Sequence, residues 1–175
     1  MKNVNLQNVE EAKEFKGLPA GGYVCTITAV KDEAEKEYLK VEYDITEGEF
    51  KGYYRDLYQS KAFWGGSFVK SYKEKALPFF KGFITSVEKS NPGYKFDYDE
   101  STLRGKAVGL VLGEEEYTGN DGTVKTRLCV NEIHSVDKIR GKQFKVPALK
   151  KLAAVTNTPS NDFVPVDVND DGLPF

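Results

Sequence analysis

The chain has little of the residue types on which most catalytic and metal sites depend. Its 175 residues include one histidine, His134, and two cysteines, Cys25 and Cys129. Two separated cysteines and one histidine do not supply the ligands of a zinc site. No triad pattern surrounds His134, and the sequence has no Gly-x-x-x-x-Gly-Lys-Ser/Thr phosphate loop. We therefore expect a non-catalytic protein without metal or cofactor; the acidic runs at 97–100 and 114–116 leave a metal-dependent nuclease as an alternative.

Long apolar stretches are lacking as well. No run approaches the roughly 18 residues needed to span a bilayer, and the first residues lack the apolar stretch of a signal peptide. Both cysteines fall within apolar runs, where a free thiol usually acts as a small buried hydrophobe. These features predict a cytoplasmic protein with a folded domain over residues 1–155. The Pro-, Asn- and Asp-rich residues 156–175 have too little apolar surface to fold alone and predict a flexible acidic tail.

Charge is unevenly distributed along the chain. The net charge is −2, but residues 161–175 contain four Asp and no Lys or Arg. The remaining residues therefore carry +2. A mildly basic body with an acidic appendage is compatible with nucleic-acid binding, which the total charge alone would argue against.

Hydrophobic periodicity predicts a mainly β chain with minor α structure. Predicted strands lie near residues 23–30, 38–46, 53–60, 108–112 and 124–130, and predicted helices near residues 8–16 and from about 74 or 76 to 91. We expect a hairpin to join the second and third strands, and residues 61–73 are assigned to no element. Pro78 fits the first turn of the second helix; alternatively, Ser71 and Glu74 form a capping box, which starts the helix earlier and kinks it at Pro78.

Five short strands with a helix between the third and fourth follow the order of the OB-fold. The OB-fold is a small Greek-key barrel that binds oligonucleotides and oligosaccharides. We therefore predict an OB-fold-like barrel preceded by a short N-terminal helix. An ordinary five-stranded α+β sheet is the alternative.

Residues 50–83 combine aromatic rings with positive charge. They hold 11 of the 22 aromatic residues, and seven Lys or Arg against two acids. Proteins bind single strands through cations along the backbone and aromatic rings under the bases. Trp64, beside Lys61 and two glycines, is the strongest candidate; alternatively, it plugs the core under a loop. The predicted DNA-binding residues of this segment are Tyr54, Arg55, Tyr58, Lys61, Phe63, Trp64, Phe68, Lys70 and Tyr72.

A second basic cluster follows the last predicted strand. Its members are Lys138, Arg140, Lys142, Lys145, Lys150 and Lys151, with no acid between them. Lys125 and Arg127 lie on the polar face of that strand, beside a Gly-Asn-Asp-Gly turn at 119–122 that would form one wall of an OB-fold groove. We add Lys125, Arg127 and Lys142 to the predicted DNA contacts; a solvated basic face is the alternative. The acidic run at 114–116 should lie outside the DNA track.

Two parts of the chain resemble known families. The last six residues, Asp170-Asp171-Gly172-Leu173-Pro174-Phe175, resemble the acidic C-terminal tip of bacterial single-stranded-DNA-binding proteins. Residues 1–150 are similar to a family of phage and mobile-element proteins long catalogued as a domain of unknown function. This second likeness rests on Tyr53-Tyr54-Arg55-Asp56-Leu57-Tyr58, Ser90-Asn91-Pro92-Gly93-Tyr94 and Gly113-Glu114-Glu115-Glu116-Tyr117.

The tail resemblance implies a role in recruiting replication and repair proteins. In that family the Pro-Phe end enters a hydrophobic pocket on the partner, while basic residues of the partner meet the acidic run. Carried over, Pro174 and Phe175 are the anchor, Leu173 is a secondary contact, and Asp170 and Asp171 supply the electrostatic part. The chain departs from the family at residue 172, where glycine replaces another acid. A merely disordered acidic end is the alternative.

Together these features predict sequence-independent binding of single-stranded DNA during replication or recombination of a phage or mobile element. The tip would recruit host or phage replication proteins. The alternative is a protein-interaction adaptor without DNA affinity of its own. A barrel this small commonly gains affinity by forming a homo-oligomer, although the sequence shows no interface pattern.

Overall fold

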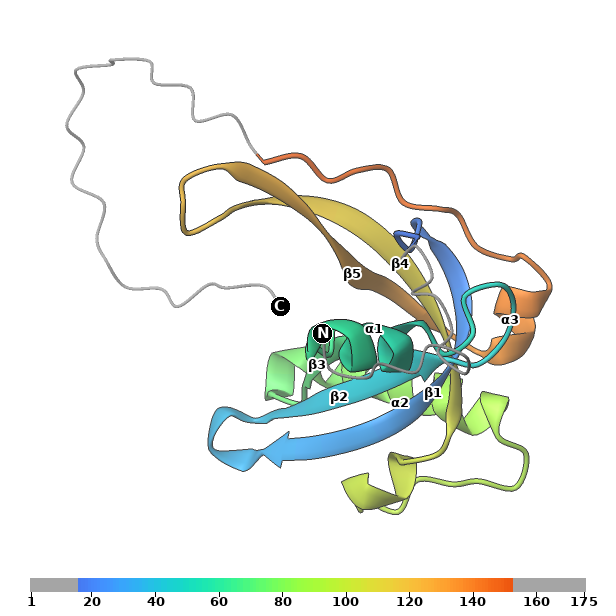
Figure 1. Ribbon diagram of the computed structural model, residues 1–175. Coiled ribbons are helices and arrows are strands. Elements are labelled where there is room, and N and C mark those ends of the chain that lie inside the picture. Colours follow the sequence, from blue (N-terminus) through green and yellow to red (C-terminus); the bar gives the residue numbers. More distant parts are fainter. Residues whose placement is uncertain (1–15, 153–175) are drawn as a thin grey trace, which may run out of the picture.

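The chain forms one open, antiparallel five-stranded sheet with few helices. The computed structural model describes residues 16–152, so the predicted helix at 8–16, apart from its last residue, and the tail at 156–175 lie outside the described residues. The sheet order is β3-β2-β1-β4-β5 (Figure 1). The strands are β1 (Gly21–Glu33), β2 (Tyr38–Ile45), β3 (Ser67–Ser71), β4 (Ala107–Thr118) and β5 (Val124–His134). The helices are α1 (Tyr53–Lys61), α2 (Leu77–Ser90) and α3 (Val136–Arg140).

The long central strand β1 forms a hairpin with β2 and also pairs with β4 of the β4–β5 hairpin. Residues 21–26 of β1 pair with β4, whereas residues 25–33 pair with β2, with a bulge at Thr28. A bulge bends the strand that carries it. In the view of Figure 1 the β1–β2 and β4–β5 hairpins extend to the same side, with α1 and β3 between them. Within residues 16–152, β3 pairs only with β2 and β5 only with β4, so these two strands are the sheet edges.

The main core lies on the inner face of the sheet. The predicted alternation in β2 is confirmed, since Leu39, Val41, Tyr43 and Ile45 are all buried. Helix α2 covers this face and buries Phe83 and Val87. Pro78 lies in the first turn of α2, as predicted, and residues 74–76 form a short 3-10 turn before it. The capping box does not form: the Ser71 hydroxyl accepts the backbone N–H of Lys73 at 3.2 Å instead.

The outer face carries a second, smaller core under α3. Val24 of β1 and Val111 of β4 are buried there against Val136 and Ile139 of α3. Gly109 permits this close approach, because a Cβ atom at that position would overlap the Ile139 side chain. The sheet is therefore covered on both faces, by helices from different parts of the chain. None of the helices within residues 16–152 is long and apolar enough to cross a membrane.

The predicted third strand at 53–60 is wrong, because these residues form α1. The prediction rested on the short connection after the second strand, which contains two glycines and favours a hairpin. Tyr53, Tyr54, Leu57 and Tyr58 also follow helical spacing, and the start of the helix is fixed from outside. Gly52 adopts φ +77°, and the Asp44 carboxylate accepts the backbone N–H of Tyr54 at 3.0 Å. This contact satisfies one of the unpaired donors at the helix N-terminus.

The strand that pairs with β2 comes instead from the unassigned region. Residues 67–71 form β3, with Phe68 opposite Val41 and Lys70 opposite Leu39. The five-strand count and the helix between the third and fourth strands are thus as predicted, although the third strand lies later in the sequence. The β4–β5 hairpin turns at residues 119–122, as predicted, with Gly122 at φ +75° and its N–H bonded to the Gly119 carbonyl at 2.9 Å.

Candidate nucleic-acid interface

The end of α1 and the loop that follows it present a group of aromatic and basic side chains. We call Tyr58, Lys61, Phe63 and Trp64 the α1–β3 surface. Tyr58 is 55% exposed and Phe63 is 62% exposed. The helix ends where Ala62 adopts φ +52° and donates its N–H to the Tyr58 carbonyl at 2.8 Å. This reversal turns Phe63 outward and leads the chain into β3.

Trp64 is held in a fixed orientation by the loop itself. Its indole N–H donates to the Gly66 carbonyl at 3.0 Å, and the same oxygen accepts the N–H of Tyr43 at 2.8 Å. The ring lies 6.3 Å from the ring centroids of both Tyr54 and Tyr58. Trp64 remains half-buried. It therefore packs on the core on one side and reaches the surface on the other, which combines the two alternatives considered from the sequence.

Two of the predicted DNA contacts lie in or against the core. Tyr54 is 5% exposed, and its hydroxyl lies 3.4 Å from that of Tyr43. Burial raises the pKa of Tyr54 to about 12. The Phe68 ring packs against Tyr43 and Phe83, with centroids 5.9 and 5.8 Å away. Both residues support the α1–β3 surface from below, and neither presents a free ring to a base.

Tyr72, a third predicted DNA contact, also makes contacts within the protein. Its hydroxyl donates to the Asp32 carboxylate at 2.7 Å, which raises the pKa of Tyr72 to about 12. Its ring packs edge-on against Phe80 at a centroid separation of 5.9 Å. The side chain thereby ties the end of β3 to the β1–β2 hairpin.

The predicted cations near this surface differ in their environment. Arg55 is exposed and lies 3.5 Å from Asp56. Lys70 lies on the core side of edge strand β3, opposite Leu39, and is half-buried. Burial lowers the pKa of its ammonium group. Within residues 16–152 Lys70 has no ion-pair partner, so its charge is available to an anion at the sheet edge.

Lys125, Arg127 and Lys142 do not join the α1–β3 surface. Leu128 and Val130 of β5 pack on the inner core, so Lys125 and Arg127 point from the outer face of the hairpin. Arg127 pairs with Glu115 at 2.6 Å and lies over the Tyr117 ring, 5.2 Å from its centroid. Lys125 pairs with Asp121 at 2.9 Å. The structure thus divides the predicted contacts between two faces of the molecule.

We expected the acidic run at 114–116 to lie outside the DNA track, but it lies beside one of the predicted contacts. Glu115 is the ion-pair partner of Arg127, so the charge of a predicted phosphate contact is partly compensated. The sequence analysis also missed Tyr117. The strand register was the available signal, because Tyr117 pairs directly with Lys125 across the hairpin and shares a face with Arg127.

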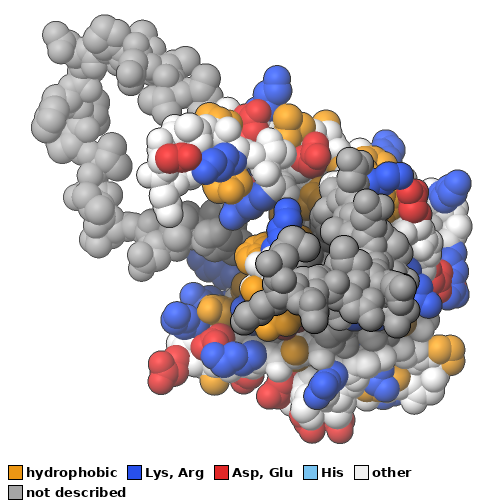
Figure 2. Space-filling view, in the orientation of Figure 1, with side chains coloured by type: hydrophobic (Ala, Val, Ile, Leu, Met, Phe, Trp, Pro, Cys, Tyr) orange, Lys and Arg blue, Asp and Glu red, His pale blue; other side chains and the backbone are white. Residues whose placement is uncertain are grey.

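A hollow separates the β4–β5 hairpin from the body of the molecule. Figure 2 shows it below the projecting hairpin, with Lys and Arg side chains at its margin.

The described residues show no arrangement suited to metal binding. Within residues 16–152 no three His, Cys, Asp or Glu side chains are grouped so as to hold a metal ion. His134 contacts Glu132 through Nε2 at 2.7 Å and Lys138 through Nδ1 at 3.4 Å. The predicted partner-binding residues Asp170, Asp171, Leu173, Pro174 and Phe175 lie outside the described residues.

Comparison of the chain with protein-family models finds no match, and a search of curated proteins finds no significant relative.

Proposed function

We propose that the protein binds single-stranded DNA without strong sequence preference, through the α1–β3 surface. The observation that carries the proposal is the grouping of Tyr58, Phe63 and Trp64 beside Lys61 at the end of one short helix. Two of these rings are more than half exposed, and the third is fixed in orientation. Stacking on such rings is worth about 1–3 kcal/mol per base and tolerates any base, because every base has a π-face.

We further propose that the fold is an OB-fold barrel opened between β3 and β5. In a closed barrel of this type β3 would pair with β5, and opening that pair leaves the order β3-β2-β1-β4-β5. The observed order and the position of α2 between β3 and β4 support this assignment. The loops between the first two and the last two strands flank the ligand groove in OB-folds. Here those loops end the two hairpins on either side of the hollow in Figure 2.

Electrostatics favour an anionic ligand in this position. Residues 50–83 carry seven Lys or Arg against two acids. Lys70 adds a half-buried cation without an ion-pair partner among residues 16–152, on the edge strand β3. A phosphate group there would restore the favourable interactions that burial removes from the ammonium group. Trp64 and Phe63 would then stack on bases, and Lys70 would contact a phosphate, at one edge of the sheet.

The acidic tip at 170–175 extends the proposal to recruitment. On this reading Pro174 and Phe175 anchor the chain to a replication or recombination protein of a phage, mobile element or host. An aromatic anchor on an acidic peptide suits a basic partner surface with an apolar pocket. The role rests on the sequence resemblance of the tip.

The decisive experiment is a titration with oligo-dT at low salt, followed by tryptophan fluorescence. Trp64 is the only tryptophan in the chain, so the signal comes from the proposed site. We expect salt-sensitive binding accompanied by a change in Trp64 emission. Absence of binding up to tens of micromolar DNA would contradict the proposal. In that case, retained binding of replication proteins through the tip would identify an adaptor.

A further inference from the structure

After α3 the chain crosses the outer face of the sheet as an extended segment. We call residues 141–152 the strap. In Figure 1 the strap is the orange-to-red stretch that follows α3 and runs along the outer side of the β4–β5 hairpin. It passes over β1 and β4, on the opposite side of the sheet from α2. The strap is therefore a different surface from the end of α1.

The strap is attached to the sheet along its length. The Phe144 ring lies so close to Gly22 of β1 that a Cβ atom there would overlap it. Pro147 packs over Gly113 of β4, where a Cβ atom would come within 3.1 Å of the proline ring. Lys150 donates its backbone N–H to the Glu114 carbonyl and accepts the N–H of Glu116, both at 2.9 Å. Apolar side chains and backbone atoms make these attachments, and the Leu152 N–H adds a hydrogen bond to the Glu116 carboxylate at 3.1 Å.

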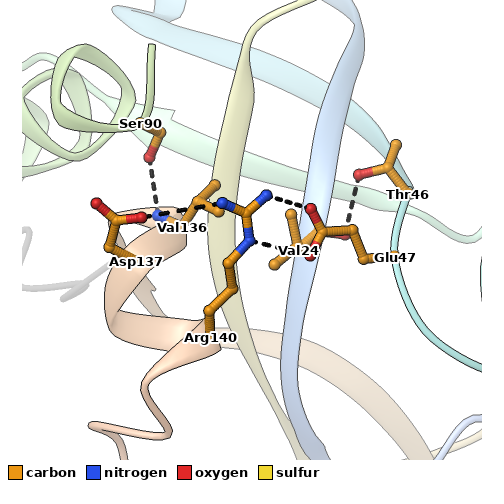
Figure 3. Close-up of polar contacts among 7 residues, drawn as sticks. All are labelled: Val24, Thr46, Glu47, Ser90, Val136, Asp137 and Arg140. Carbon is orange, nitrogen blue, oxygen red and sulfur yellow. Dashed lines mark hydrogen bonds and ion pairs between the residues drawn. The ribbon is translucent and has the colours of Figure 1, made fainter. Parts of the chain in front are cut away.

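The base of the strap is fixed by polar contacts around α3. Figure 3 shows Arg140 reaching Glu47, which follows β2, through two hydrogen bonds. The backbone N–H of Val136 donates to the Ser90 hydroxyl of α2 at 2.9 Å. Helix α3 is thereby tied to two other elements. The strap begins from a fixed point directly after Arg140.

The lysines of the strap take no part in these attachments through their side chains. Lys142, Lys145, Lys150 and Lys151 are all exposed, and the strap contains no acid. Within residues 16–152 none of their ammonium groups forms an ion pair. The neighbouring cations are compensated instead: Arg140 by Glu47, and Arg127 by Glu115. Uncompensated charge on this face is therefore concentrated on the strap.

We propose that the strap is a second nucleic-acid contact that holds the sugar–phosphate backbone alone. This inference rests on the proposed function, and it places a DNA strand bound at the α1–β3 surface against the strap over another part of its length. The strap exposes lysines but no aromatic ring, since Phe144 is packed against the sheet. Ammonium groups bind phosphates by charge and read no base. The two surfaces therefore differ in chemistry, with stacking on one and charge alone on the other.

The strap is suited to this role because its charges are held in place before binding. Lys150 follows Lys142 by eight positions, and an extended chain of that length spans up to about 26 Å. The attachments to β1 and β4 fix the backbone between them, so binding orders only lysine side chains. Each phosphate contact on a single strand contributes about 0.7 to the slope of log affinity against log salt.

The test compares two variants with the same loss of charge. In the strap variant, Lys142→Gln, Lys145→Gln and Lys151→Gln remove three ammonium groups but leave the backbone of Lys150 in place. In the control variant, Lys89→Gln, Lys95→Gln and Arg104→Gln remove three exposed cations outside both residues 50–83 and the strap. Oligo-dT affinity is measured between low and moderate salt, and thermal melts confirm that both variants fold.

We expect the strap variant to lower the magnitude of the salt slope by up to about 2, and the control variant to change it much less. The change in Trp64 emission at saturation should stay the same, and the slope difference should persist on an abasic strand. With short oligonucleotides the difference should vanish, because they occupy the α1–β3 surface alone.

Equal slopes for both variants, with normal binding by the wild type, would overturn the strap proposal and leave the proposed function standing. Loss of the slope difference on an abasic strand would show that the strap reads bases and would also overturn it. A wild-type protein that binds no DNA would refute both proposals together.

Discussion

Replacement of Phe63 by alanine isolates the contribution of one aromatic ring to binding. The ring is 62% exposed, and a Cβ atom at Gly65 would lie 3.2 Å from it. Its removal therefore leaves the core intact, and we expect the free energy of unfolding to change by less than about 0.5 kcal/mol. A base stacked on the ring contributes about 1–3 kcal/mol. The affinity for oligo-dT should then fall by about 5- to 150-fold.

The assay is a fluorescence titration at fixed salt, since Phe63→Ala keeps Trp64 as the reporter. Tyr98→Ala is the matched control, because Tyr98 is 93% exposed on the loop before residue 100, far along the chain from the α1–β3 surface. The control should bind as the wild type does. Urea unfolding of both variants checks that the fold is retained. Unchanged affinity of a folded Phe63→Ala protein would refute stacking at this surface.

Three further predictions concern the framework that holds the surface. Asp44→Ala removes the acceptor for the N–H of Tyr54 and should lower the free energy of unfolding by about 1–2 kcal/mol in urea titrations, as loss of a helix cap does. Burial raises the pKa of Tyr43, and it raises the pKa of Tyr54 to about 12. Because folding favours the protonated hydroxyls, the free energy of unfolding should be constant below the ordinary pKa of 10 and should fall as the pH rises from 10 through 12. The Tyr54→Phe variant should weaken this pH dependence. Burial raises the pKa of the Cys25 and Cys129 thiols, and Cys25 is fully buried. A thiol reagent should therefore modify Cys129 first and Cys25 only on unfolding. Equal rates of modification in the native protein would contradict this prediction.

The β2 strand and the β4–β5 hairpin were predictable because local sequence determines them. Leu39, Val41 and Tyr43 alternate with polar residues over a full strand, and only one face can be buried. The turn at 119–122 supplies Gly122 where φ is positive. Tertiary contacts reinforce these local preferences but do not change them.

Helix α1 and strand β3 were not predictable in the same way, because contacts distant in sequence decide them. The Asp44 carboxylate caps α1 from the end of β2, and β3 has five residues with only Phe68 packed on the main core. A short tyrosine-rich segment fits either structure by propensity. The pairing partner of β2 was therefore assigned to the wrong segment.

The candidate site was predictable in composition but not in arrangement. The rings of Trp64 and Tyr58 lie 6.3 Å apart, and Phe63, which directly precedes Trp64, is exposed. Tyr54 lies one helical turn before Tyr58 in α1 and yet is 5% exposed, whereas Tyr58 is 55% exposed. Arg127 belongs to the other side of the molecule, which depends on the register of β5 against β4. The separation of two residues in the sequence does not indicate whether they lie on the same face of the molecule.

The Gly66 carbonyl has a consequence for how the protein can be observed. It accepts both the indole N–H of Trp64 and the backbone N–H of Tyr43, and a Cβ atom at Gly66 would overlap the Tyr43 carbonyl oxygen. The single indole is therefore coupled to the backbone of β2 through one shared atom. When β2 separates from the loop, the indole loses its orientation at the same moment. Tryptophan emission in a denaturation experiment should accordingly report the integrity of the sheet centre, although the ring itself lies beyond the sheet edge.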